Sequence, residues 1–399
     1  MPADQDPNDT PGLLAELGCE YTGLNGYEDL LLAMQAVRDS DAWSQARDRF
    51  DELTLDELRA LLSDAGIREA LRLVRVGLSK PISTVRPVLD QETPFPEIGY
   101  ARDLARLIAA EQRLLVEDGQ TAEAADSLRV GLGLGREFQH DGLVAGLVGC
   151  IVTAIAAHSA ARHLPRFTAG DCATVAATCR EWLSEPDGLA NVIEREHAGA
   201  LRTLERMLVQ RDLDPASVMV LDFPDVPELD TPELAELTAE MRRRAAAVEQ
   251  ARHDAERAAM LRDGDARIID AAFARFRRLC PRSHWERAPS ELMCSLARAT
   301  DGDEPLAVEI ADAIIGPLES AFGAYAQQEA FVRLLTTEAL LHRWQRQQRA
   351  FPADLATLAV GDLVIDPFMG RPFNYELATN DFDLYSAGRN PRRPLRLAR

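Results

Sequence analysis

Residues 101–138, ARDLARLIAAEQRLLVEDGQTAEAADSLRVGLGLGREF, carry the clearest structural pattern in the chain. The first half repeats apolar residues at helical spacing, at Leu104, Leu107, Ile108, Leu114 and Leu115. Gly119 follows at the position where a left-handed residue commonly ends a helix. The second half has small residues where two helices can approach closely, at Ala122, Ala124 and Ala125. The stretch therefore predicts two helices joined by a tight turn, and a mainly α fold.

This helix pair resembles a tetratricopeptide-type hairpin, but it occurs once and does not recur at a fixed period. We therefore expect a multi-helix bundle with repeat-like hairpins, not a repeat array. A capping box at Thr54 and Glu57 marks another helix start. Further helices are predicted near 142–164, 169–184, 187–211, 232–262, 264–279, 288–299 and 304–349.

Shifts in composition divide the chain into six segments. Its first residues are polar and acidic, as in a disordered terminus, and a later segment is rich in proline and acidic residues, as in a linker. The predicted organisation is a disordered N-terminus (1–10), a helical body (11–212), a linker (213–231), a second helical region (232–328), a helix with a β-hairpin (329–390) and a basic tail (391–399).

The charge balance excludes one large class of partner. The formal net charge is -21, so a nucleic-acid backbone would be repelled and we expect no nucleic-acid binding. The end of the chain is a local exception, which we interpret either as a frayed basic tail or as a contact with an anionic surface or acidic partner. Its arginines are Arg389, Arg392, Arg393, Arg396 and Arg399. Lys80 is the single lysine, a skew that we attribute to genome composition.

The six cysteines are scattered and form no CxxC motif. Cys172 and Cys179 are seven residues apart on a predicted helix, and two helical turns separate them too far for a disulfide. Most of the six are expected to be small buried apolar residues, and the even count leaves a single bridge open.

The most apolar run, Gly142–Ala157, is 16 residues long and is bounded by Asp141 and His158. A membrane-spanning helix needs about 20 apolar residues. We therefore expect a buried central helix and no transmembrane segment. The first residues, MPADQDPNDTPG, lack the basic and apolar regions of a signal peptide.

Three motifs were weighed as functional sites. GLGLG (131–135) lacks the GxGxxG spacing and follows a helical pattern, so it is not expected to bind a dinucleotide. Glu194 and His197 share a helical face, as in one half of a di-metal carboxylate site, but the second Glu-x-x-His is missing. Glu338 and His342 are four residues apart. We assign no catalytic, cofactor-binding or metal-binding residue.

The helical pattern ends at Phe351–Pro352, because proline biases the residue before it out of the helical region. A short helical turn (353–359) and the loop DPFMGRP (366–372) follow. The segments FNYEL and FDLYS alternate apolar and polar residues, and ATND forms a turn between them. This pattern predicts an antiparallel β-hairpin. Its apolar face would carry Phe373, Tyr375, Leu377, Phe382 and Leu384. Because an isolated hairpin is marginal, this face should be buried on the preceding long helix.

This order of elements resembles the globular part of type II secretion pseudopilins and related type IV pilin-like proteins. The matching residues are Phe351, Pro352, Leu355 and Leu358, then Asp366, Pro367 and Phe368, then Tyr375, then Ser386, Gly388 and Asn390. The resemblance covers about 70 of the 399 residues. The chain is also similar to uncharacterised bacterial envelope proteins that join a helical body to such an ending, which implies an extracytoplasmic or envelope setting.

The ending departs from the pseudopilin pattern at two points. An amphipathic helix stands where the family has its hydrophobic N-terminal helix, so a pilus subunit is not expected. Asn390 stands where the family's calcium loop has an aspartate, so a calcium site is not expected.

Two functional hypotheses follow. The first is a non-enzymatic helical scaffold or protein-interaction protein, of a bacterial envelope or secretion-related assembly, with an unidentified protein partner. The alternative is a hydrolase or metal-dependent enzyme whose site is assembled from dispersed carboxylates and histidines. The oligomeric state stays open. The compartment is extracytoplasmic if the pilin-like ending is meaningful, and cytoplasmic if Met1 is the native start.

Overall fold

A computed structural model describes residues 12–17, 19–83, 97–139, 142–185, 188–209, parts of 267–278, 305–388 and 392–397. Within these residues the fold is mainly α with one small antiparallel sheet, as predicted. The chain divides into two compact units, unit 1 (1–86, 95–188 and 324–399) and unit 2 (87–94 and 189–323). The predicted N-terminus 1–10, the linker 213–231 and the helices near 232–262 and 288–299 lie outside the described residues.

Unit 1 opens with a group of helices, and side chains cap the starts of four of them. The group consists of α1 (Leu13–Glu16), α2 (Gly26–Arg38), α3 (Asp41–Ala46), the 3₁₀ helix η1 (Arg47–Glu52), α4 (Leu55–Ser63) and α5 (Ala65–Leu78). Asn25, Ser40 and Asp64 cap α2, α3 and α5. The capping box of Thr54 and Glu57 is present at α4, as predicted. α2 and α5 pack together, and one apolar core joins this group to α6.

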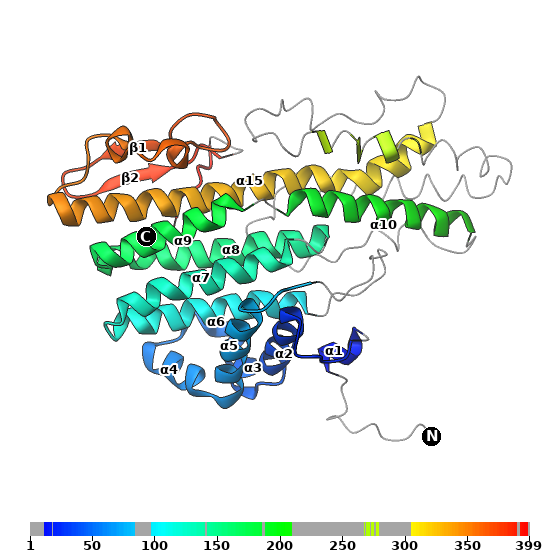
Figure 1. Cartoon of the computed structure of the whole chain (residues 1–399), viewed down its shortest axis with the longest axis horizontal. Coiled ribbons are helices and arrows are strands. Elements are labelled where there is room, and N and C mark those ends of the chain that lie inside the picture. The colour runs from blue at the N-terminus through cyan, green and yellow to red at the C-terminus, as the bar shows by residue number, and fades with distance from the viewer. Residues whose placement is uncertain are drawn as a thin grey trace. The chain divides into compact units, whose positions relative to one another are not determined.

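The helical hairpin that the sequence predicts is confirmed as α6 (Ile98–Glu117) and α7 (Thr121–Phe138). Gly119 lies between them at φ +79°, the left-handed conformation expected of the residue after a helix. α8 (Leu143–His163), the 3₁₀ helix η2 (Leu164–Arg166) and α9 (Ala169–Ser184) follow, close to their predicted bounds. Figure 1 shows α6, α7 and α8 side by side in unit 1.

The glycines of GLGLG lie inside α7, in agreement with the helical pattern of the sequence. Gly131 and Gly135 pack closely against α8. A Cβ on Gly131 would lie 2.8 Å from Ala156 Cβ, and a Cβ on Gly135 would lie 2.9 Å from the carbonyl oxygen of Gly149. Real Cβ atoms do not approach other atoms this closely, so the two helices can cross here only because these positions lack side chains.

α8 with η2 (Leu143–Arg166) is long and apolar enough to cross a membrane, alone in this among the described helices, and 61% of its most apolar window is buried inside the structure. It packs against both α6 and α7, in agreement with the expected central helix.

The long helix α15 (Pro305–Gln348) begins in unit 2 and continues into unit 1, where its second half carries the C-terminal cap. The cap consists of the 3₁₀ helices η5 (Leu355–Leu358) and η6 (Gly361–Val364) and the antiparallel strands β1 (Asn374–Leu377) and β2 (Phe382–Tyr385). Figure 1 shows the two strands lying along α15. Phe373, Phe382 and Leu384 join one core with α8, α9 and α15, so the hairpin is buried on the long helix as predicted.

Two details of the cap differ from the prediction. Leu377 was expected on the buried face, but it is 50% exposed, whereas its cross-strand partner Phe382 is buried in the core. Leu377 is the last residue of β1, next to the exposed turn 378–381. The expectation of a frayed basic tail is wrong for residues 392–397, since Leu395 pairs with Ser386 and Leu397 is buried. Arg389 and Arg399 lie outside the described residues.

Unit 2 contains α10 (Leu189–Val209), helical residues between 267 and 278, and the first half of α15. These match the helices predicted near 187–211, 264–279 and 304–349. Ile193, Ile269 and Phe273 are buried within it.

The glycine contact between α7 and α8 can be tested with a matched pair of substitutions. Gly149→Ala would place a methyl group against the carbonyl oxygen of Gly135, and overpacking of this kind costs roughly 1–3 kcal/mol. Gly99→Ala, with no atom within 4 Å of its new Cβ, should stabilise by about 0.5–1 kcal/mol through helix propensity. Urea unfolding monitored by circular dichroism should give opposite signs, and equal shifts would contradict the close crossing.

Candidate functional site

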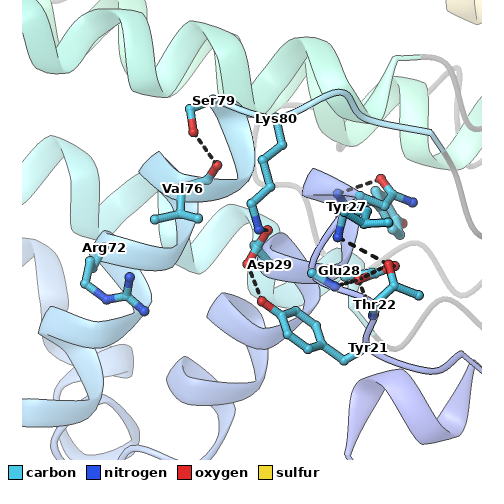
Figure 2. Close-up of polar contacts among 12 residues, drawn as sticks. Tyr21, Thr22, Tyr27, Glu28, Asp29, Arg72, Val76, Ser79 and Lys80 are labelled. Carbon is cyan, nitrogen blue, oxygen red and sulfur yellow. Dashed lines mark hydrogen bonds and ion pairs between the residues drawn. The ribbon is translucent and has the colours of Figure 1, made fainter.

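A partly buried ion pair lies where α2 and α5 cross, and it contains the single lysine of the chain. Lys80 Nζ donates to Asp29 Oδ2 at 2.5 Å, and Tyr21 Oη donates to Asp29 Oδ1 at 3.2 Å. The Asp29 side chain is 1% exposed and that of Lys80 is 24% exposed. Figure 2 shows Lys80 reaching from the end of α5 to the first turn of α2.

The neighbouring carboxylate of Glu28 holds the loop that precedes α2. Its oxygens accept hydrogen bonds of 2.8 Å from Thr22 N, Thr22 Oγ1 and Gly23 N. Burial alone would raise the pKa of Glu28, but these hydrogen bonds and the charge of Lys80 outweigh it, so the pKa lies below its ordinary value. Glu28 is therefore an ionised carboxylate that fixes the backbone of the loop.

The backbone contact between α2 and α5 places this cluster. A Cβ on Gly77 would lie 2.7 Å from the carbonyl oxygen of Gly26, so the two helices touch at glycines three residues before Asp29 and Lys80. The chain after α5 then runs along the start of α2, where Gly26 N donates to Pro81 O and Ser83 N donates to Asn25 Oδ1. The ion pair is therefore one part of a continuous seam between the two segments.

The chemistry available to this cluster is structural. The hydrogen bond to Asp29 raises the pKa of Lys80 above its ordinary value, so the amine stays protonated and is not a nucleophile near neutral pH. Sequence reasoning missed the pair. The available signals were the single lysine and the adjacent acids Glu28 and Asp29 in the first turn of an amphipathic helix.

Glu194 and His197, which were weighed as half of a metal site and not assigned as ligands, are bonded to other groups in unit 2. Arg277 binds the Glu194 carboxylate with two nitrogens at 2.5 and 2.7 Å, which holds the pKa of Glu194 below its ordinary value. Arg277 Nη2 also donates to His197 Nδ1 at 2.7 Å. Since arginine cannot accept a hydrogen bond, His197 must carry its proton on Nε2, which donates to Asp270 Oδ1 at 2.8 Å.

This network leaves neither residue of the pair open to a metal ion. A metal would have to displace Arg277 from Glu194 and from His197. Among the described residues, no group of three or more His, Cys, Asp or Glu side chains could hold a metal ion.

The remaining sequence candidates are packing residues. His342 meets the rings of Phe351 and Phe382 edge-on at 5.7 Å, and Glu338, four residues earlier, is buried. Cys172 and Cys179 are both unpaired, as predicted, and burial raises their pKa to about 11 and about 12. Thiols of this kind stay protonated and unreactive. Cys280 and Cys294 lie outside the described residues.

A second buried carboxylate, Asp366, organises the C-terminal cap. Its Oδ1 accepts from Ser386 Oγ and from Phe368 N, and its Oδ2 accepts from Ala387 N, all at 2.9 Å. Asp366 and Ser386 are 1% and 0% exposed. The aspartate of the DPF loop and the serine that follows β2 are thus in direct contact, although 20 residues separate them.

We predict that Lys80→Met destabilises the protein more than the double variant Lys80→Met with Asp29→Asn. The single change leaves a buried carboxylate without its cation, whereas the double change removes both charges. Urea midpoints measured for the two variants and for Asp29→Asn complete the cycle. Equal losses for the single and double variants would show that the Asp29 carboxylate carries no penalty without its cation, and would contradict the prediction.

Acid unfolding tests the role of Glu28. Because its folded pKa lies below the reference value of 4.5, its contribution to stability is complete above about pH 4.5 and is lost as the pH falls through the folded pKa. The difference in unfolding free energy between the native protein and Glu28→Gln should therefore be constant at neutral pH and shrink below pH 4.5. Glu20→Gln, exposed in the same loop, is the control. A difference that does not change with pH would refute the assignment.

Comparison with known proteins identifies no relative of the chain. Neither protein-family models, nor curated proteins, nor solved structures match the chain.

Proposed function

We propose that this chain is a non-enzymatic helical scaffold or protein-interaction protein whose C-terminal cap is pilin-like, and that it works in a bacterial envelope or secretion-related assembly. Its helical hairpins offer the surface for a protein partner. With a net charge of -21, that surface favours partners with basic patches.

The observation that carries the proposal is the Asp366 contact in the cap. The residues that match the pilin-like order are distant in sequence, yet several of them bond to one another. Asp366 accepts from Ser386, and Gly388 N donates to Ser386 Oγ at 3.0 Å. Tyr375 Oη donates to the carbonyl oxygen of Pro352 at 2.7 Å, which ties β1 to the end of α15. Through these contacts the matching residues have one structural role, which is to close the hairpin onto the helix.

The polar clusters support a role in binding rather than in chemistry. Lys80 is paired with Asp29, Glu194 with Arg277, and Asp366 with backbone and hydroxyl donors. Each of these groups is bonded to a partner within the protein, which fits a rigid scaffold.

Fractionation of the native host tests the setting. The protein should be recovered with the envelope or outside the cell, and recovery wholly in the cytosol would overturn the proposal. The partner should then be captured with carboxylate-reactive or photoactivated cross-linkers, since the single lysine gives amine reagents almost no target.

Two aspartate variants show whether the cap contributes to capture of that partner. Asp366→Ala removes the acceptor of three hydrogen bonds and should abolish the cross-linked product. Asp362→Ala, at an exposed position of the same cap, should leave it unchanged. Equal yields from the two variants would place the partner surface elsewhere.

A further inference from the structure

Three arginines gather where the end of α6 packs against the end of α8 and η2. They are here called the arginine patch and consist of Arg113, Arg162 and Arg166. Two hydrogen bonds join the helix ends. Ser159 Oγ donates to Gln112 Oε1 at 2.6 Å, and Arg166 Nη2 donates to the carbonyl oxygen of Val116 at 3.0 Å. Arg113 follows Gln112, and Arg162 lies between Ser159 and Arg166, so the patch is fixed to one packed contact of unit 1.

One of the three arginines is paired and two are not. Arg166 forms an ion pair with Glu117. Arg113 and Arg162 are exposed, and within the described part of the chain neither donates a hydrogen bond nor joins an ion pair. The patch therefore presents two free guanidinium groups beside a third, although the chain as a whole carries a net charge of -21.

The buried ring of His163 lies within the field of all three arginines. Burial is the largest cause of its low pKa of about 4. The charges of Arg166, Arg162 and Arg113 lower this pKa further, whereas the charge of Glu117 raises it. The arginines thus act together on one point of the structure, and positive charge prevails there.

The number of arginines indicates the kind of anion that fits the patch. A carboxylate is satisfied by one arginine, as Glu194 is by Arg277. A phosphate group carries more charge and three acceptor oxygens, so guanidinium groups from two helices can bind it together. A long polyanion would also meet the acidic remainder of the surface and be repelled, which favours a compact ligand.

We propose that the arginine patch binds the phosphate group of a compact anion, either a free phosphate compound or the headgroup of an anionic lipid. Arg113 and Arg162 supply the free guanidinium groups, and Arg166 adds the third positive charge while it holds η2 to the end of α6. This binding site is additional to the proposed scaffold function, and it does not depend on the pilin-like resemblance.

Two probes distinguish the two sources of phosphate. Inorganic pyrophosphate is titrated into the native protein by calorimetry at low salt, and phosphatidylcholine vesicles with and without phosphatidic acid are tested by co-sedimentation. Binding of pyrophosphate alone would assign a soluble ligand, and binding of the phosphatidic acid vesicles would assign a lipid headgroup. In either case Arg113→Gln/Arg162→Gln should weaken binding by roughly tenfold or more, because it removes two charged donors.

Arg68→Gln/Arg180→Gln is the matched control. It removes the same charge from two exposed arginines of α5 and α9, which likewise have no ion-pair partner among the described residues, and it should bind like the native protein. The NMR signal of the His163 ring gives a local readout. It should shift when pyrophosphate is added to the native and control proteins, and stay unchanged in Arg113→Gln/Arg162→Gln.

Native protein that binds neither probe would overturn the proposal. Equal loss of binding in the two double variants would also overturn it, because net charge rather than the patch would then decide binding. None of these results bears on the cell compartment or on a protein partner, so failure here is distinguishable from failure of the proposed function.

Discussion

The C-terminal cap of unit 1 depends on one buried carboxylate. Asp366 lies in the loop between η6 and β1. Its carboxylate accepts hydrogen bonds from Ser386 Oγ and Ala387 N, which follow β2. A buried charge is costly unless hydrogen bonds satisfy it, so the loop and the residues after β2 must close around it together. That closure fixes the hairpin against α15 and positions Ser386, whose backbone pairs with Leu395.

A comparable constraint acts at the other end of unit 1. Gly26 and Gly77 let α2 and α5 touch, and Asp29 and Lys80 then form an ion pair over the contact. Between the two ends, the glycines of α7 bring α8 close enough to complete the bundle. At both of these crossings glycine lets two helix backbones approach closely, and at the crossing of α2 and α5 a polar cluster also fixes the adjacent loop. A body built in this way presents fixed surfaces, which suits a scaffold.

Local signals in the sequence predicted the fold well where a single element carries its own evidence. The hairpin of α6 and α7, the capping box at Thr54 and the two β-strands all have turn or cap residues within a few positions of the element they define. The residues of the candidate site could not be predicted in this way, because Asp29 and Lys80 are 51 residues apart and come together only where two helices cross. The burial of Leu397 was missed for the same reason. The positive charge and the terminal position suggested a loose tail, but Leu397 packs on the core.

Hydrogen exchange in the cap tests the central claim most directly. If the Asp366 carboxylate holds the cap as one cooperative unit, the amide protons of Phe368 and Ala387 should exchange with the same opening free energy as those of the hairpin and of residues 330–341 in α15. Exchange of these two amides at the rate of an exposed loop, while the hairpin stays protected, would show that the carboxylate does not organise the cap.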